Sequence, residues 1–136
     1  MYPAEIVEPC RQDLIEAGVT ELRTPVEVDS VLGEKGTAMV VVNSVCGCAA
    51  GAARPAVRLA MQHEKLPDKR VSVFAGVDKE ATQRARSHMH GYPPSSPSIA
   101  LFKDGRLVYM LERHQIEGRG PQEIAYNLVE AFDEFC

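Results

Sequence analysis

The sequence predicts a three-layer α/β/α sandwich with a mixed central sheet, and three observations carry this prediction. Segments of strand character alternate with segments of helix character along most of the chain, as in a largely parallel sheet covered by helices on both faces. The last two predicted strands are joined by Asp104-Gly105, a strong signal for an antiparallel hairpin. The length of 136 residues and the apolar content of 45% suit one domain over residues 1–136 with a hydrophobic core.

A leading helix is predicted over residues 4–17, ahead of the alternating pattern. Pro9 interrupts this helix and is a candidate for its first regular position, because proline is tolerated where a helix starts. A short strand is predicted at residues 19–23. The stretch TPVE then opens a helix over residues 24–32, since its threonine can cap the helix and its glutamate can complete a capping box.

Residues 38–42 form a continuous apolar run, which is typical of a strand buried on both faces. An alanine-rich helix follows and is expected to reach about residue 64, with a kink at Pro55. The remaining predicted elements are a strand at 70–75, a helix at 79–88 capped by Asp78, strands at 98–103 and 106–112, and a last helix opened by Gly120-Pro121.

Between the strand at 38–42 and the alanine-rich helix lies the stretch Cys46-Gly47-Cys48. The start of a helix carries unpaired N–H groups and a partial positive charge, and both stabilise a thiolate over a thiol. The thiolate is the nucleophile in disulfide exchange. We therefore expect Cys46 to be the more acidic and more exposed cysteine and the attacking group, with Cys48 placed to resolve a mixed disulfide.

Gly47 separates the two cysteines, and geometry gives a reason for a glycine there. Residues two apart in a regular helix point to nearly opposite sides. A bond between Cys46 and Cys48 needs non-helical dihedral angles, which glycine adopts most easily. The ring that such a disulfide closes has about 11 atoms, against about 14 for CxxC, and strained disulfides are the more oxidising ones. The pair is therefore expected to favour its reduced form.

The residues alone leave three readings of the CGC turn open: a redox site, half of a metal site, or two small side chains filling a core. The metal alternative would combine the turn with His88 and His90, or with Cys10 and Cys136. A second cysteine pair with zinc-ribbon spacing is absent from the sequence. We expect Cys10 to pack on its helix face and Cys136, as the last residue, to be a mobile free thiol.

Composition and charge narrow the class of partner. The net charge is -4, and the basic and acidic residues are interspersed, which argues against a nucleic-acid partner. The longest apolar run, residues 37–53, is too short to span a bilayer, so a membrane partner is not expected. The first residues, MYPAEIVEPC, lack the segments of a signal peptide, which favours a cytoplasmic location. Neither a cofactor nor a resident metal is expected.

The stretch GYPPSSPSIALFKDG, residues 91–105, resembles the thioredoxin segment of a proline, a buried strand and a hairpin. This resemblance implies a thioredoxin-like fold in which the Ser96–Pro97 bond is cis and lies beside Cys46. The backbone there would then bind an extended substrate. The sequence departs from thioredoxin in having no tryptophan and no CGPC, and Val40 stands where thioredoxins have a buried acid. Proton handling must therefore differ.

The stretches VVNSVCGCAAGAARPA, GYPPSSPSIALFKDG, ERHQIEG and AFDEFC are similar to those of the bacilliredoxin family, bacterial proteins with a CxC motif. The resemblance covers nearly the whole chain. It implies removal of a bacillithiol-type low-molecular-weight thiol from S-thiolated client proteins, with Cys46 as nucleophile and Cys48 as the second thiol. Protein disulfide isomerisation is the alternative within redox chemistry, and metal binding by Cys46 and Cys48 is the alternative of another class.

Overall fold

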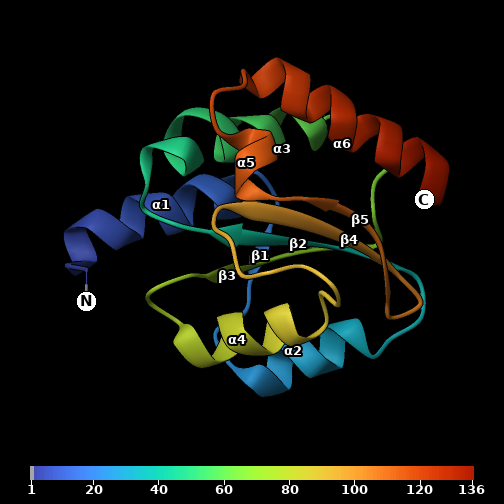
Figure 1. The fold of residues 1–136 in the computed structure, drawn as a ribbon, viewed down its shortest axis with the longest axis horizontal. Coiled ribbons are helices and arrows are strands. Elements are labelled where there is room, and N and C mark those ends of the chain that lie inside the picture. The colour runs from blue at the N-terminus through green and yellow to red at the C-terminus, as the bar shows by residue number, and fades with distance from the viewer. Residues whose placement is uncertain (1) are drawn as a thin grey trace.

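The computed structural model describes residues 2–136 and is built on a five-stranded sheet with the order β1-β3-β2-β4-β5 (Figure 1). The strands are β1 (Thr20–Glu21), β2 (Thr37–Asn43), β3 (Lys69–Phe74), β4 (Ser98–Lys103) and β5 (Arg106–Leu111). Strand β3 runs parallel to both β1 and β2, whereas β4 is antiparallel to both β2 and β5. The predicted mixed sheet is confirmed.

Helices cover both faces of this sheet. They are α1 (Ala4–Glu16), α2 (Pro25–Leu32), α3 (Arg54–Ala60), α4 (Lys79–Ser87), α5 (Arg113–Ile116) and α6 (Pro121–Phe135). Helices α2 and α4 pack together below the sheet in Figure 1, and α3 and α6 pack together above it. The three-layer α/β/α sandwich with a leading helix is therefore confirmed.

The central strand β2 is buried along its whole length. Its side chains alternate between the two apolar cores: Met39 and Val41 pack with α3 and α6, whereas Val40 and Val42 pack with α2 and α4. A strand between two helical layers needs apolar residues at every position, and this is why the sequence is continuous rather than alternating here. The cores fix the end of β2, which leads directly into the CGC turn.

The segment after the CGC turn differs from the single kinked helix that the sequence predicts. A π-helical turn at Ala49–Ala53 precedes α3, and the N–H of Arg54 donates to the C=O of Ala49, five residues back. Pro55 has no N–H, and its ring would crowd the carbonyl four residues earlier in a regular helix. The wider π turn accommodates this proline, and α3 ends at Ala60 rather than near residue 64.

Helix α1 starts at Ala4 and continues through Pro9, so Pro9 is not its first regular position. Pro9 and Glu5 are both exposed. The Glu5 carbonyl, which loses its helical donor at Pro9, therefore lies on the side of the helix that water reaches, and the helix tolerates the proline.

Asp78 occupies the predicted N-cap position of α4, but its side chain makes no capping hydrogen bond. Its carboxylate instead accepts a hydrogen bond of 2.8 Å from the guanidinium of Arg11. Arg11 is only 5% exposed, lies over the ring of Phe74 and also pairs with Glu21. A buried guanidinium without a carboxylate partner is strongly destabilising, so the Asp78 carboxylate pairs with Arg11 instead of capping the helix.

Two local features of the chain around β4 agree with the sequence. Asp104 and Gly105 have φ angles of 51° and 78°, as the predicted two-residue hairpin turn requires. The Ser96–Pro97 bond is cis, as the thioredoxin resemblance implies. The short helix α5 was not predicted, because four residues are too few to show a helical period.

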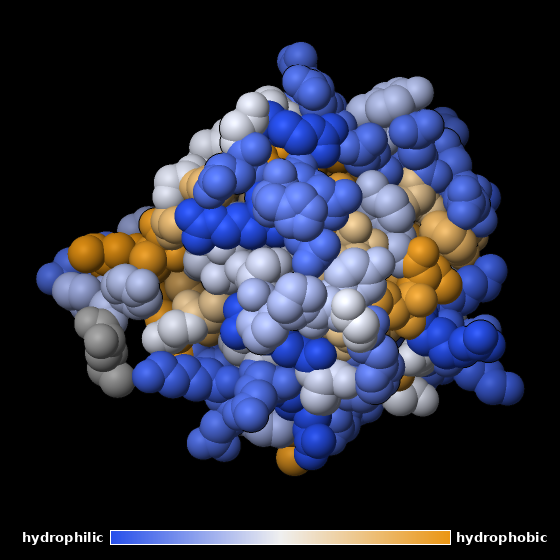
Figure 2. All heavy atoms as spheres, viewed as in Figure 1, coloured by the Kyte–Doolittle hydropathy of each residue, from blue (hydrophilic) through white to orange (hydrophobic). Residues whose placement is uncertain are grey.

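The surface is mostly hydrophilic on the face shown in Figure 2, with hydrophobic atoms gathered in separate patches. None of the helices within residues 2–136 combines the length and the apolar character needed to cross a bilayer.

The capping box of α2 leads to a stability prediction. The N–H of Glu27 donates to the Thr24 hydroxyl at 3.2 Å, and the N–H of Thr24 donates to the Glu27 carboxylate at 3.1 Å. Thr24→Ala should lower the free energy of unfolding by about 1 kcal/mol, measured by urea denaturation. Ser30→Ala, at an exposed position of the same helix, is the control and should cause no loss. Equal effects of the two changes would contradict the capping role.

Candidate active site

The CGC turn follows the end of β2, at the centre of the sheet. The carbonyl of Cys46 accepts hydrogen bonds from the N–H groups of Ala49 and Ala50, at 3.1 and 3.2 Å, and these bonds form a helical turn that leads into the π turn. Cys46 and Cys48 are both free thiols and both are half-buried. The greater exposure that we expected for Cys46 is therefore not what distinguishes the two cysteines.

The environment of Cys46 favours its thiolate. Burial raises the pKa of Cys46. The hydroxyl of Ser44, the N–H groups of Ala49 and Cys48, and the positive charge of Arg113 act in the opposite direction and together hold this pKa below its ordinary value. The Ser44 hydroxyl donates to the Cys46 sulfur at 3.1 Å. The directions of the two pKa shifts agree with the expectation that Cys46 is the more acidic cysteine, and the N–H groups at the start of the helical segment contribute as expected.

Cys48 lies in the opposite kind of environment. Burial raises the pKa of Cys48, as do its hydrogen bond to Glu117 and the negative charge of Cys46, whereas Arg113 acts against them. The Cys48 thiol donates to the Glu117 carboxylate, with 3.5 Å between Sγ and Oε2. Two cysteines one residue apart therefore differ in acidity because different neighbours contact them.

A buried polar network holds the backbone beneath Cys46. Arg54, 5% exposed, donates to the Ser44 carbonyl at 2.7 Å and to the Asn43 side-chain oxygen at 3.1 Å. Its Nε donates to Asp13 of α1 at 3.0 Å. The same Asn43 oxygen accepts from the Ser44 N–H at 2.9 Å. Ser44 is thus fixed from two sides, with its hydroxyl directed at Cys46.

Val40, the position at which the thioredoxin resemblance implied a buried acid, is an apolar core residue that is 1% exposed. The polar contact of the Cys46 sulfur comes from Ser44 instead. Sequence reasoning assigned no role to Asn43, Ser44 or Arg54. The available signal was that Asn43 and Ser44 interrupt an apolar run just before the cysteines, and that Arg54 lies within an alanine-rich run.

Arg113 joins the CGC turn to the loop that carries the cis proline. Its guanidinium lies 3.9 Å from the Cys48 sulfur, donates to the Ser96 carbonyl at 3.3 Å and pairs with Glu117 at 3.1 Å. Pro97, next to Ser96, is buried. Sequence reasoning gave neither Arg113 nor Glu117 a role. Their spacing of four residues within ERHQIEG was the signal for an ion pair on one helical face.

Gly47 is exposed and avoids the left-handed region of φ. A Cβ at this position would meet none of the described atoms within 4 Å. The geometry with two free thiols therefore tolerates a side chain there. The need for glycine stays a prediction about the Cys46–Cys48 disulfide.

The metal alternative lacks a set of ligands. Within residues 2–136 the structure places no three Cys, His, Asp or Glu side chains where they could hold one ion. His88 instead contacts Asp29 at 3.4 Å. Cys10, half-buried as expected on its helix, donates to the carbonyl of Ile6 at 3.4 Å.

Cys136 is packed rather than free of contacts, contrary to our expectation of a mobile terminus. Its N–H donates to the carbonyl of Phe132 at 2.8 Å, and its side chain packs against the core beneath α6. Burial raises the pKa of the Cys136 thiol, which argues against a reactive thiolate at this end of the chain.

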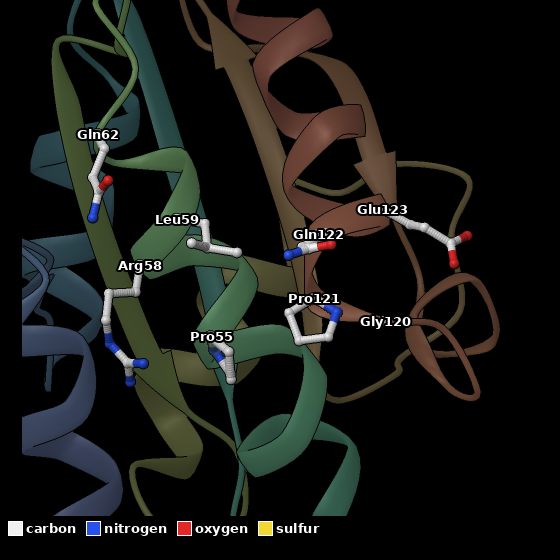
Figure 3. A pocket seen from close by; sticks show the side chains of 8 residues that line it. All are labelled: Pro55, Arg58, Leu59, Gln62, Gly120, Pro121, Gln122 and Glu123. Carbon is white, nitrogen blue, oxygen red and sulfur yellow. The ribbon is translucent and has the colours of Figure 1, made fainter.

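A hollow of about 420 Å³ lies between α3 and the start of α6. Figure 3 shows Pro55 and Leu59 of α3 facing Pro121 and Gln122 of α6 across it. No cysteine lines this hollow. Cys46 and Cys48 therefore lie outside this hollow.

Known proteins share both the fold and the sequence. Residues 2–136 match a family described as Disulphide isomerase. A bacilliredoxin of Halalkalibacterium halodurans is 54% identical, over 97% of this chain and 91% of that protein. A bacilliredoxin of Cytophaga hutchinsonii is also 54% identical, over 98% and 99% of the two chains.

The solved structures similar to this chain include thioredoxins. Oxidised thioredoxin of Plasmodium falciparum matches with a TM-score of 0.58 and 17% identity, over 84% of this chain and 97% of that one. A thioredoxin of Malassezia sympodialis matches with a TM-score of 0.61 and 15% identity, over 86% and 90% of the two chains. At such low identity these matches show the fold alone.

An acidic cysteine at a strand–helix turn of the thioredoxin fold, in a chain with bacilliredoxin relatives, defines a thiol–disulfide oxidoreductase. The relatives extend the likeness over nearly the full length of the chain and come from bacteria. The chain belongs to the bacilliredoxin family.

The contact between Ser44 and Cys46 is open to a direct test. Ser44→Ala removes one hydrogen bond to the thiolate, and such bonds to charged groups are worth about 1.5 kcal/mol, or about one pKa unit. The pKa of Cys46 should rise, so its alkylation by iodoacetamide at slightly acidic to neutral pH should slow by about three- to tenfold. Peptide mapping follows Cys46 alone. Ser44→Thr keeps a hydroxyl and should retain most of the rate. Unchanged labelling in Ser44→Ala would show that the hydroxyl does not stabilise the thiolate.

Proposed function

We propose that this protein removes a low-molecular-weight thiol of the bacillithiol type from mixed disulfides on client proteins, through Cys46. The observation that carries the proposal is the unequal acidity of the two cysteines: the pKa of Cys46 is lowered and that of Cys48 is raised. One cysteine is therefore prepared to attack, while the other stays a thiol. This arrangement fits a reaction in which a single thiolate performs the first exchange.

The first step is an exchange of one disulfide for another. The Cys46 thiolate attacks the sulfur of the small thiol, a new bond forms between the two sulfurs, and the client cysteine leaves as a thiolate. The client is thereby reduced, and the small thiol is held on Cys46. A second small thiol or Cys48 then clears it. The reaction needs no cofactor, and the partners are S-thiolated client proteins and the small thiol.

Ser96 and Pro97 are proposed to bind the client near Cys46. The cis bond before Pro97 and the contact of Arg113 with both Ser96 and Cys48 support this assignment. The Ser96 carbonyl already accepts a hydrogen bond from Arg113. Because a carbonyl oxygen has two lone pairs, an extended client can pair with this carbonyl beside the guanidinium of Arg113 or in its place.

Protein disulfide isomerisation is the second candidate, and the description of the matching family favours it. It uses the same Cys46 attack, but the substrate is a disulfide within a protein. A cytoplasmic location is proposed for either reaction, with neither nucleic acid nor membrane as a partner. The fate of Cys48 separates the two candidates, because an isomerase that rescues trapped substrates needs its second thiol.

Cysteine variants test the proposal. Cys46→Ala should abolish removal of a small thiol from an S-thiolated client, because the attacking thiolate is gone. Cys48→Ala should retain most of the activity when free small thiol is supplied, because that thiol can clear Cys46. Mass spectrometry of the client and of Cys46 measures both. Equal loss of activity in the two variants would contradict the single-thiol route and favour the isomerase, with scrambled-protein refolding as its assay.

A further inference from the structure

The carboxylate of Glu117 has no part in the first exchange, yet it contacts the second cysteine of the site. Its Oε2 lies 3.5 Å from the Cys48 sulfur and accepts the S–H hydrogen bond. Two routes can clear the adduct from Cys46, and only one of them uses Cys48. We propose that Glu117 decides between them: it withholds Cys48 as a bound thiol and leaves the adduct to a second small thiol. This inference rests on the proposed function.

The two routes differ in their bonds and protons. In the first, a small thiolate attacks the sulfur of the small thiol on Cys46, a symmetric small-thiol disulfide forms, and Cys46 leaves as a thiolate. In the second, Cys48 loses its proton to water and attacks Cys46. The Cys46–Cys48 disulfide forms, and the small thiol leaves as a thiolate. Only the second route oxidises the cysteine pair.

Cys48 lies two residues from the adduct on Cys46, so the second route is expected to be faster unless something suppresses attack by Cys48. A thiol attacks a disulfide as its thiolate. The S–H of Cys48 donates to a carboxylate, and this bond exists only while the proton is present. The hydrogen bond therefore favours the form of Cys48 that does not attack.

Arg113 holds Glu117 in this position. The ion pair between them is 3.1 Å long, and the same guanidinium is bound to the Ser96 carbonyl. The hydrogen bond from Arg113 lowers the pKa of Glu117, so the carboxylate stays ionised at neutral pH. The charged and titratable groups that act on Cys48 are Cys46, Arg113 and Glu117. Among them, Glu117 is the group that accepts the Cys48 proton in a hydrogen bond.

The effect of Glu117 on Cys48 can be separated from the effect of Arg113 on Cys46. The pKa of Cys46 depends on Arg113, Ser44 and two backbone N–H groups, whereas Glu117 is not among its causes. Removal of the Glu117 charge with the shape preserved should therefore act directly on the second step, and on the first step only through its partner Arg113. Glu117→Gln meets this requirement.

The test uses 4,4′-dithiodipyridine as a neutral disulfide in a full-length chain with Cys10→Ala and Cys136→Ala. Attack by Cys46 releases one thiopyridone, and attack by Cys48 on the adduct releases a second, each followed by absorbance. If Glu117→Gln lowers the pKa of Cys48 by about one unit, the thiolate fraction rises about tenfold and its nucleophilicity falls about threefold. The second release should be about threefold faster at neutral pH, and its pH midpoint should fall. The first release is the internal reference and should change less than the second, because Glu117 reaches Cys46 only through Arg113.

A second release that is slower in Glu117→Gln would overturn the inference, since Glu117 would then act as a base that assists Cys48. An unchanged second release with an unchanged pH midpoint would overturn it as well. Glu123→Gln, which neutralises an exposed carboxylate of α6, is the matched control and should leave both releases unchanged. Peptide mass spectrometry on the chain that keeps Cys10 and Cys136 provides the same test if the background variant does not fold.

The proposed function and this inference fail in different ways. Absence of a small-thiol adduct on Cys46, after mixing with an S-thiolated client, would remove the proposed function. An adduct that forms normally on Cys46, but whose clearance by Cys48 does not respond to Glu117→Gln, would remove only the role of Glu117.

Discussion

The buried guanidinium of Arg54 is the contact on which the site depends. It binds Asp13 in α1, and it binds Asn43 and Ser44 at the end of β2, so one charge connects the leading helix, the central strand and the start of α3. A buried charge is costly unless carboxylate and carbonyl oxygens surround it. The geometry that satisfies Arg54 is therefore also the geometry that fixes Ser44 beneath the Cys46 sulfur. The leading helix, which at first sight is an appendage to the fold, supplies a necessary carboxylate.

The pKa values of the two cysteines are shifted in opposite directions by different neighbours. Cys46 is contacted by the Ser44 hydroxyl and by backbone N–H groups at the start of the helical segment, and these contacts stabilise negative charge on its sulfur. The contact of Cys48 comes from the segment after β5, where Glu117 stabilises the protonated form. Arg113 contacts the Cys48 sulfur and the Ser96 carbonyl, and its charge also acts on Cys46, so the loop of the cis proline and the thiol pair share one cation.

The sequence was sufficient for the architecture because the architecture depends on burial. The continuous apolar run of β2, the capping box of α2 and the Asp104-Gly105 turn each have one physical solution, and the structure adopts it. The failures have several causes, and the one at Asp78 is a contact with a residue far away in the sequence. Asp78 was assigned as a cap from local pattern alone, but Arg11, 67 residues earlier in the chain, claims its carboxylate. Local propensity does not contain such a distant competitor.

The site was predictable only as far as its cysteines. The place of Cys46 at a strand–helix turn accounts for part of its acidity, whereas Ser44 and Arg113 supply the rest, and the low acidity of Cys48 depends on burial and on Glu117, 69 residues away in sequence. The absence of the buried acid at Val40 showed that proton handling must differ from thioredoxin, but it did not name the replacement. Two separate groups contact the thiols instead. The Ser44 hydroxyl, positioned by the buried Arg54, contacts the attacking thiol, and the Glu117 carboxylate, paired with the exposed Arg113, contacts the second thiol. Ser44 therefore acts on the attacking thiol and Glu117 on the second thiol, while Arg113 couples the two because its charge acts on both.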